Sequence, residues 1–187
     1  PMLMSAPTIV DDGGSAAVFV NLGGTRLVRL DGDGAVVFEQ QFADGHATGR
    51  RAAQPLCTSE LSDRAELVFA GHDGMLRVLD LDGKARWNLD VGARIMGVPA
   101  VMPASADEPP MLVCAAGNGR VVYVTPGGEI AREHSLGTAV EGSVVLADAD
   151  GDGAPEVLVG TSRTLRTHVL DRSGQEIARL PYGAIWS

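Results

Sequence analysis

The stretch that decides the fold is Glu66-Leu-Val-Phe-Ala-Gly-His-Asp-Gly-Met-Leu-Arg-Val-Leu-Asp-Leu-Asp-Gly-Lys-Ala-Arg-Trp87. It contains two apolar runs, residues 66–71 and 75–80, whose length is usual for β-strands and too short for a stable helix. Glycine-containing turns follow both runs, at residues 71–74 and 81–83. Because glycine favours tight turns while valine and phenylalanine favour strands, the stretch predicts antiparallel strands joined by tight turns.

The same pattern recurs along the whole chain. A turn glycine precedes the last predicted strand of each copy: Gly34, Gly83, Gly128 and Gly174. These glycines are 49, 45 and 46 residues apart. A second turn glycine is shared by the first three copies, Gly24, Gly74 and Gly119. Residues 161–164 take its place in the fourth copy. With an apolar strand upstream in each copy, this pattern predicts an all-β protein built from four repeats of four short antiparallel strands.

Repeats of about 45 residues with four strands each are typical of β-propeller blades. A four-stranded sheet cannot cover both of its own faces, so neighbouring blades must pack against one another. The predicted blades are approximately residues 1–44, 45–91, 92–136 and 137–181, and residues 182–187 are predicted to begin a further blade. Four blades in a half-ring would expose two apolar end faces. We therefore expect a larger ring of seven or eight blades, completed by further sequence or by a second copy in a homodimer.

Large side chains are scarce, with eight aromatic residues in the chain. We expect Phe38 and Trp87, which occupy the same place in successive copies, to fill the space between neighbouring blades. Two cysteines, Cys57 and Cys114, are too few for a disulfide framework and lack the spacing of metal ligands. Both are predicted to be reduced and buried, because free cysteine behaves as a small hydrophobic residue.

Residues 147–160 have a sequence that predicts a metal site. The predicted ligands are the side chains of Asp148, Asp150, Asp152 and Glu156 and the carbonyl of Ala154. Three of the carboxylates lie on alternate residues, a spacing that suits oxygen ligands of calcium, a hard cation. The intervening Gly151 and Gly153 allow the backbone to curl around an ion. Because four carboxylates this close repel one another strongly, a bound Ca²⁺ ion is favoured over an ordinary solvated turn.

This segment begins like an EF-hand loop and then departs from one. An EF-hand has a bidentate glutamate at its twelfth position, which is Val159 in this chain. The acid comes at the ninth position, inside a predicted strand, so the predicted calcium site lies on a β-hairpin. The other three copies lack alternating carboxylates at the corresponding place, so one ion is expected. Residues 31–34, Asp-Gly-Asp-Gly, lack a third acid and are predicted to be an ordinary turn.

The composition excludes some classes of partner. The chain has 15 Lys and Arg residues against 24 Asp and Glu residues, a formal net charge of −9, and no basic run to attract a phosphate backbone. We therefore expect no nucleic-acid partner. No apolar run reaches the roughly 18 residues needed to cross a bilayer, so no membrane span is expected. The hydrophobic residues, 45% of the chain, suffice for a packed core.

Residues 143–160, Ser-Val-Val-Leu-Ala-Asp-Ala-Asp-Gly-Asp-Gly-Ala-Pro-Glu-Val-Leu-Val-Gly, resemble an FG-GAP/VCBS-type propeller repeat. Residues 67–87 resemble a quinoprotein-like (PQQ-like) repeat. The two resemblances together cover essentially the whole chain, strongly in residues 66–180 and loosely in the first 50. They imply a β-propeller, and the FG-GAP/VCBS resemblance implies calcium ligands at the five positions named above. Such repeats more often have Asp where this chain has Glu156.

We predict a non-catalytic, calcium-stabilised scaffold that binds a protein or a glycan. The alternative is the propeller portion of an enzyme, because propellers with such repeats also occur in polysaccharide lyases and quinoprotein dehydrogenases. No catalytic motif occurs, and the four histidines occupy four different places in the repeat, which favours surface or structural roles. Arginine outnumbers lysine 14 to one, as is typical of a GC-rich bacterial genome. A calcium site favours an extracellular or periplasmic location.

Overall fold

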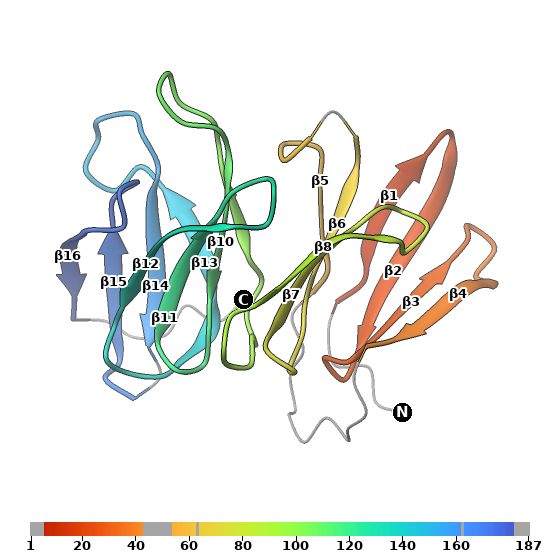
Figure 1. Ribbon diagram of the computed structural model, residues 1–187, viewed down its shortest axis with the longest axis horizontal. Helices are drawn as coiled ribbons and strands as arrows, with labels where there is room; N and C mark the ends of the chain where they lie inside the picture. Colours follow the sequence, from red (N-terminus) through yellow and green to blue (C-terminus); the bar gives the residue numbers. More distant parts are fainter. Residues whose placement is uncertain (1–5, 43–53, 63, 162, 182–187) are drawn as a thin grey trace.

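The computed structural model describes residues 6–42, 54–62, 64–161 and 163–181. These residues form four sheets of four antiparallel strands, and the strands of every sheet are hydrogen-bonded in chain order. No helix occurs among them. The all-β prediction and the four strands of each repeat are therefore confirmed. The sheets stand side by side in chain order across the molecule (Figure 1).

We number the sheets as blades 1 to 4. Blade 1 contains β1 (Thr8–Asp12), β2 (Ser15–Leu22), β3 (Arg26–Leu30) and β4 (Val36–Gln41). Blade 2 contains β5 (Leu56–Thr58), β6 (Glu66–Ala70), β7 (Met75–Leu79) and β8 (Ala85–Asp90). Blade 3 contains β9 (Ala100–Met102), β10 (Met111–Ala115), β11 (Arg120–Val124) and β12 (Ile130–Ser135). Blade 4 contains β13 (Val140–Ala147), β14 (Glu156–Thr161), β15 (Arg166–Leu170) and β16 (Glu176–Leu180).

The turn between the third and fourth strands has the same geometry in all four blades. Its glycine has a φ between 83° and 88° in every copy. The glycine N–H donates to the carbonyl three residues earlier, as Gly83 does to Asp80 at 3.0 Å, and Asp80 Oδ1 accepts the N–H of Lys84 at 2.8 Å. Residues 31–34 adopt this geometry in blade 1, as predicted for an ordinary turn. The repeated glycine therefore reflects a backbone conformation that residues with a Cβ atom rarely adopt.

The turn between the second and third strands departs from the predicted alignment in blade 1. In blade 2 the carbonyl of Gly74 accepts the N–H of Val91 at 2.9 Å. The equivalent bond in blade 1 runs from the N–H of Phe42 to the carbonyl of Thr25 at 2.8 Å. The counterpart of Gly74 is therefore Thr25, and not Gly24 as the alignment of glycines predicts. With this correction, both turns recur at the same intervals.

In blade 4 the counterpart of Gly74 is Leu165, which directly precedes β15. It is the only non-glycine residue with a positive φ in the described part of the chain, at 51°. A left-handed conformation costs an L-residue roughly 1–2 kcal/mol, so other contacts must hold this turn. Thr161 Oγ1 supplies two of them, a 2.6 Å hydrogen bond with Thr164 Oγ1 and a 3.1 Å bond to the carbonyl of Arg166.

Three apolar clusters fill the space between successive blades. The first, between blades 1 and 2, is formed by Ala17, Phe19, Leu27, Leu67, Phe69 and Leu79. The second, between blades 2 and 3, includes Val68, Leu76, Val78, Leu112, Val122 and Val124. The third, between blades 3 and 4, includes Val113, Val121, Tyr123, Val157, Val159 and Leu170. Alternate residues of one strand therefore pack into the clusters on opposite sides of the blade. For this reason the inner strands of blades 2 and 3 are apolar on both faces.

Large side chains of the fourth strands bridge neighbouring blades, as predicted for Phe38 and Trp87. A Cβ atom at Gly83 would lie 2.8 Å from Phe38 Cζ, and one at Gly128 would lie 2.7 Å from the Trp87 ring. The Trp87 Nε1–H also donates to the carbonyl of Pro126 at 2.9 Å. The turn glycines therefore leave room for a side chain from the preceding blade.

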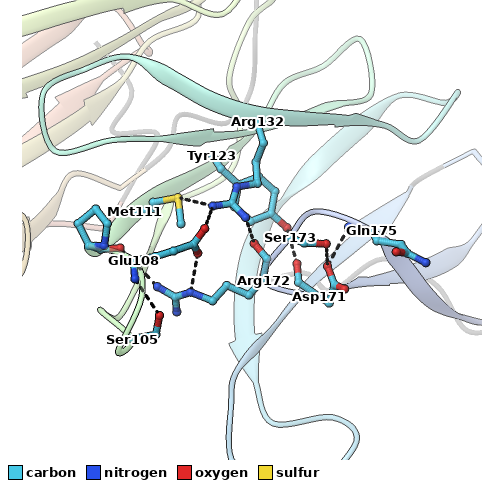
Figure 2. A network of polar contacts seen from close by, with 10 residues as sticks. Ser105, Glu108, Met111, Tyr123, Arg132, Asp171, Arg172, Ser173 and Gln175 are labelled. Atoms are coloured by element: carbon cyan, nitrogen blue, oxygen red, sulfur yellow. Dashed lines mark hydrogen bonds and ion pairs between the residues drawn. The ribbon is translucent and has the colours of Figure 1, made fainter.

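An arginine takes this bridging place in blade 3 (Figure 2). Arg132 donates to the carbonyl of Arg172 at 2.9 Å and pairs with Glu108, which also accepts the Nε–H of Arg172 at 3.0 Å. The hydrogen bond from Arg132 is the main cause that lowers the pKa of the Glu108 carboxyl. The Tyr123 hydroxyl donates to the carbonyl of Asp171 at 3.1 Å. At this bridging position, polar contacts thus join blade 3 to blade 4, whereas aromatic rings join blade 1 to blade 2 and blade 2 to blade 3.

The four blades do not close into a ring. Blades 1 and 4 lie at opposite ends of the molecule (Figure 1). A Cβ atom on Gly34 would have no neighbour within 4 Å, whereas those on its counterparts in the other blades would contact side chains of the preceding blade. Ala178, the counterpart of Trp87 in blade 4, is exposed. Within the described residues, the outer face of blade 1 is therefore open, whereas on the outer face of blade 4 Ala178 is exposed but Thr167 and Val169 are buried. The tail at 182–187 lies outside the described residues.

The two free cysteines differ in burial, which leads to a labelling prediction. Cys114 is fully buried, as predicted, and burial raises the pKa of its thiol to about 12. Cys57 is only half-buried, which corrects the prediction for that residue, although burial also raises its pKa. Because the thiolate is the reactive form, we expect DTNB to label Cys57 slowly in the native protein and Cys114 only after unfolding. Rapid labelling of both native thiols would contradict this result.

Candidate metal centre

The loop between β13 and β14 brings three acidic side chains together. Ligand oxygens of Asp148, Asp150 and Glu156 lie within 4.8 Å of one another. No other group of three or more Asp, Glu, His or Cys side chains with this spacing occurs in the described ranges. Ala147 pairs with Glu156 across the two strands, so the loop closes a β-hairpin, as the sequence predicts.

The carboxylate of Asp148 shapes this loop. Its Oδ1 accepts the N–H of Gly151 at 2.7 Å and its Oδ2 accepts the N–H of Gly153 at 3.1 Å. Both glycines have positive φ values, 85° and 89°, and a Cβ atom on either would have open space. Glycine is therefore needed for conformation and not for room. The side chain of Asp152, another predicted ligand, is not in the group of three, and its Oδ1 accepts the N–H of Ala154 at 2.7 Å.

Glu156 is the buried member of this acidic group. Glu156 is 3% exposed, whereas Asp148 and Asp150 are exposed residues. One oxygen accepts the N–H of Ala149 at 2.6 Å. No Lys, Arg or His side chain of the described chain pairs with Glu156. A buried carboxylate beside two further carboxylates is costly unless a positive charge compensates for it.

In blade 2, an arginine side chain neutralises the glutamate at the position that corresponds to Glu156. Glu66 is the first residue of β6, as Glu156 is of β14, and it is 2% exposed. Its partner is Arg86, which immediately precedes Trp87 in β8. The corresponding residue of blade 4 is Ile177, which cannot supply a charge. In blade 4 an uncharged residue, Ile177, therefore takes the place of the arginine of blade 2, and Glu156 lies beside the acidic side chains of the loop.

One polar residue that sequence reasoning assigned a surface or structural role lies in a cleft. His168 is 2% exposed and lines the space between blades 3 and 4 with Arg166 and Arg179. Its counterpart in blade 3 is Val122, a core residue. In the sequence, a histidine at a repeat position that is apolar in blade 3 was the signal that could have identified His168 as a candidate functional residue. His46 lies outside the described residues.

Comparisons with known proteins show similarity in structure and not in sequence. No protein-family model matches the chain, and no curated protein matches it. The structure of BBS1N, crystallised in complex with ARL6DN, matches with a TM-score of 0.66 at 13% identity, covering 96% of this chain and 56% of BBS1N. BamB from Moraxella catarrhalis matches with a TM-score of 0.53 at 18% identity, covering 95% and 64%.

A third match is the V. cholerae biofilm matrix protein Bap1, with a TM-score of 0.53 at 18% identity over 99% of this chain and 41% of Bap1. BBS1N and BamB are β-propellers, so the chain has a β-propeller fold, as predicted. At these identities the likeness shows the fold alone. The chain spans just over half the length of BBS1N. The described part of the chain contains no helix that is long and apolar enough to span a bilayer.

Proposed function

We propose that this chain is a non-catalytic propeller module that binds one calcium ion on blade 4 and acts as a scaffold for a protein or glycan ligand. The observation that carries the metal site is the burial of Glu156 beside Asp148 and Asp150 without a cationic partner among the described residues. A divalent cation would supply the charge that Arg86 supplies to Glu66 in blade 2.

The chemistry of the donors favours calcium over other metals. All candidate ligands are oxygen atoms, whereas zinc prefers histidine and cysteine. The loop offers several carboxylates and main-chain carbonyls at a flexible turn, which suits the six to eight ligands of calcium better than the strict octahedron of magnesium. Asp152 and the carbonyl of Ala154 would join the shell by small rotations of the loop. Because calcium is abundant outside the cytoplasm, we place the protein in the extracellular space or the periplasm.

The scaffold role is supported by the fold. BBS1N, which has a similar fold, was crystallised in complex with ARL6DN. A propeller presents many loops on a rigid framework, and such loops can bind a protein or a glycan. We further propose that the outer faces of blades 1 and 4 are covered by further blades, and that a second copy of the chain can supply them.

The comparison of Glu156 with Glu66 leads to a test in which an arginine side chain competes with the calcium ion for Glu156. We expect Ile177→Arg to recreate the ion pair of blade 2 and to weaken calcium binding at least about tenfold in isothermal titration with CaCl2. Ile177→Gln, which has a polar side chain without a charge, is the matched control and should leave the affinity close to that of the unchanged protein. Ile177 is 43% exposed, so both substitutions fit without repacking the core.

Two results would contradict the proposed metal site. The first is the absence of measurable calcium binding by the unchanged chain. The second is equal calcium affinity in Ile177→Arg and Ile177→Gln, because the new guanidinium would then not compete with the ion for Glu156. A parallel titration with MgCl2 tests the choice of metal, and tighter binding of magnesium than of calcium would overturn it.

A further inference from the structure

A cleft between blades 3 and 4 combines basic residues with a buried histidine, in a chain whose net charge is −9. Its volume is about 400 Å³, within the usual range for small-molecule sites. The walls come from the link between the two blades, the turn before β15, and strands β15 and β16. The lining residues are Leu136, Gly137, Thr138, Thr164, Arg166, His168 and Arg179. The cleft is separate from the acidic loop, which joins β13 to β14.

Comparison of the repeats shows that blade 4 has reversed a charge at this cleft. In blade 1 the first residue of the third strand, Arg26, pairs with Glu39 of the fourth strand at 2.7 Å. Blade 3 repeats the arrangement with Arg120 and Glu133. The strand register places Arg179 of blade 4 at the position of Glu133, opposite His168 as Glu133 is opposite Val122. Two arginines therefore stand where blades 1 and 3 have an ion pair.

The charges around the cleft leave one arginine unneutralised. Arg179 donates to both oxygens of Glu176, from Nε at 2.8 Å and from Nη2 at 2.6 Å. No described carboxylate pairs with the guanidinium of Arg166. With one acid, Glu176, against two arginines, the cleft has a net charge of about +1 before any charge on His168 is counted. A single anionic group would balance it.

His168 supplies the second feature of a binding site. Its Nδ1 lies 2.7 Å from Glu176 Oε1. The hydrogen bonds from Arg179, more than that from His168, lower the pKa of Glu176 to about 2, so this carboxylate is ionised and can only accept. The proton of a neutral His168 is therefore on Nδ1. Its Nε2 is then an acceptor, and it is buried without a hydrogen-bond partner among the described residues.

His168 Nε2, an acceptor without a partner, and Arg166, without a paired carboxylate in the described part of the chain, together favour a ligand with two kinds of group. The arginines call for an anion, and His168 Nε2 calls for a hydrogen-bond donor. A carboxylate next to a hydroxyl group meets both demands, whereas a fully ionised phosphate offers no donor and brings more charge than the cleft can balance. We propose that this cleft binds a hydroxy-carboxylate, such as a uronic acid residue of an acidic glycan, with its carboxylate at Arg166 and Arg179 and a hydroxyl at His168 Nε2.

D-glucuronate is the probe that tests this site, in calcium-containing buffer so that the metal loop stays in one state. We expect it to shift the imidazole resonances of His168 in a saturable way, with the signal identified from its absence in His168→Asn. D-glucose has the hydroxyl groups without the charge, and acetate has the charge without a hydroxyl. Both should bind at least about tenfold more weakly than glucuronate, because each loses one charge-assisted or buried hydrogen bond.

Substitutions at equivalent positions of two blades provide the matched pair. Arg166→Ala should weaken glucuronate binding at least about tenfold, while Arg120→Ala in blade 3 should leave it unchanged. Arg166 is exposed, so its replacement leaves the core intact, and thermal melting verifies the fold of each variant. The proposal is overturned if glucuronate leaves His168 unshifted, if Arg166→Ala binds it as well as the unchanged chain, or if acetate or inorganic phosphate binds more tightly than glucuronate.

Discussion

Removal of calcium with EGTA is expected to lower the melting temperature of this protein by roughly 5 to 10 °C. A ligand that binds only the folded state stabilises it by RT ln(1 + [L]/Kd), about 2.7 kcal/mol at a hundredfold excess over Kd. For a chain of this size, each kcal/mol shifts the melting temperature by about 2–4 °C. The physical source is the acidic group of Asp148, Asp150 and Glu156, whose mutual repulsion is relieved by the ion. Scanning calorimetry with and without EGTA measures the shift.

A pair of aspartate variants separates this effect from a general change in charge. Asp150→Asn removes one of the three converging carboxylates, so the variant should melt at the same temperature with calcium and with EGTA. Asp33→Asn removes an exposed carboxylate from the turn of blade 1 and should keep the full response of the unchanged protein. Superimposable scans of the unchanged protein in calcium and in EGTA would show that the loop does not bind this ion.

The strands and turns of the repeat could be predicted because their causes are local. Turn glycines such as Gly83 and Gly128 are required by a positive φ, and the apolar strands that precede them, β7 and β11, are buried on both faces. Local patterns also misled where a turn changed its length. Blade 1 has glycines at 23 and 24, but the equivalent position is Thr25, and in blade 4 it is Leu165. An alignment of glycines alone shifts blade 1 by one residue.

The features of the candidate sites that escaped prediction depend on pairing across strands. The loop acids were evident from their spacing, yet the reason that Glu156 lacks a cationic partner among the described residues is Ile177, 21 positions later in the chain. The cleft depends in the same way on Arg179, which stands opposite His168 only because of the register of β15 and β16. Each position of a blade has a counterpart in the other three blades. An unusual residue at one position can therefore be recognised once the strand register of all four blades is known.

The open outer face of blade 1 leads to the second large expected effect, which is association of the chain into a dimer. In blade 2 the face toward blade 1 carries Leu67, Phe69 and Leu79, all 0% exposed. The strand register places Val18 and Leu30 of blade 1 at the positions of Leu67 and Leu79, but here both are only half-buried. Soluble monomers rarely leave such an apolar face uncovered. Light scattering of the purified chain should therefore report twice the chain mass of 19.4 kDa.

A two-fold axis makes such a dimer self-limiting. If blade 4 of one copy packs on blade 1 of the other, the same contact forms twice and no open face remains, which gives an eight-bladed ring. Gly34 would then receive a side chain from the partner, as Gly83 receives Phe38. Val20→Lys in the open face of blade 1 should halve the mass, whereas Ile130→Lys on blade 3, an inner blade, should not. A 19.4 kDa monomer at high concentration that melts in one cooperative step would contradict this assembly, because its end faces would then be stable in water.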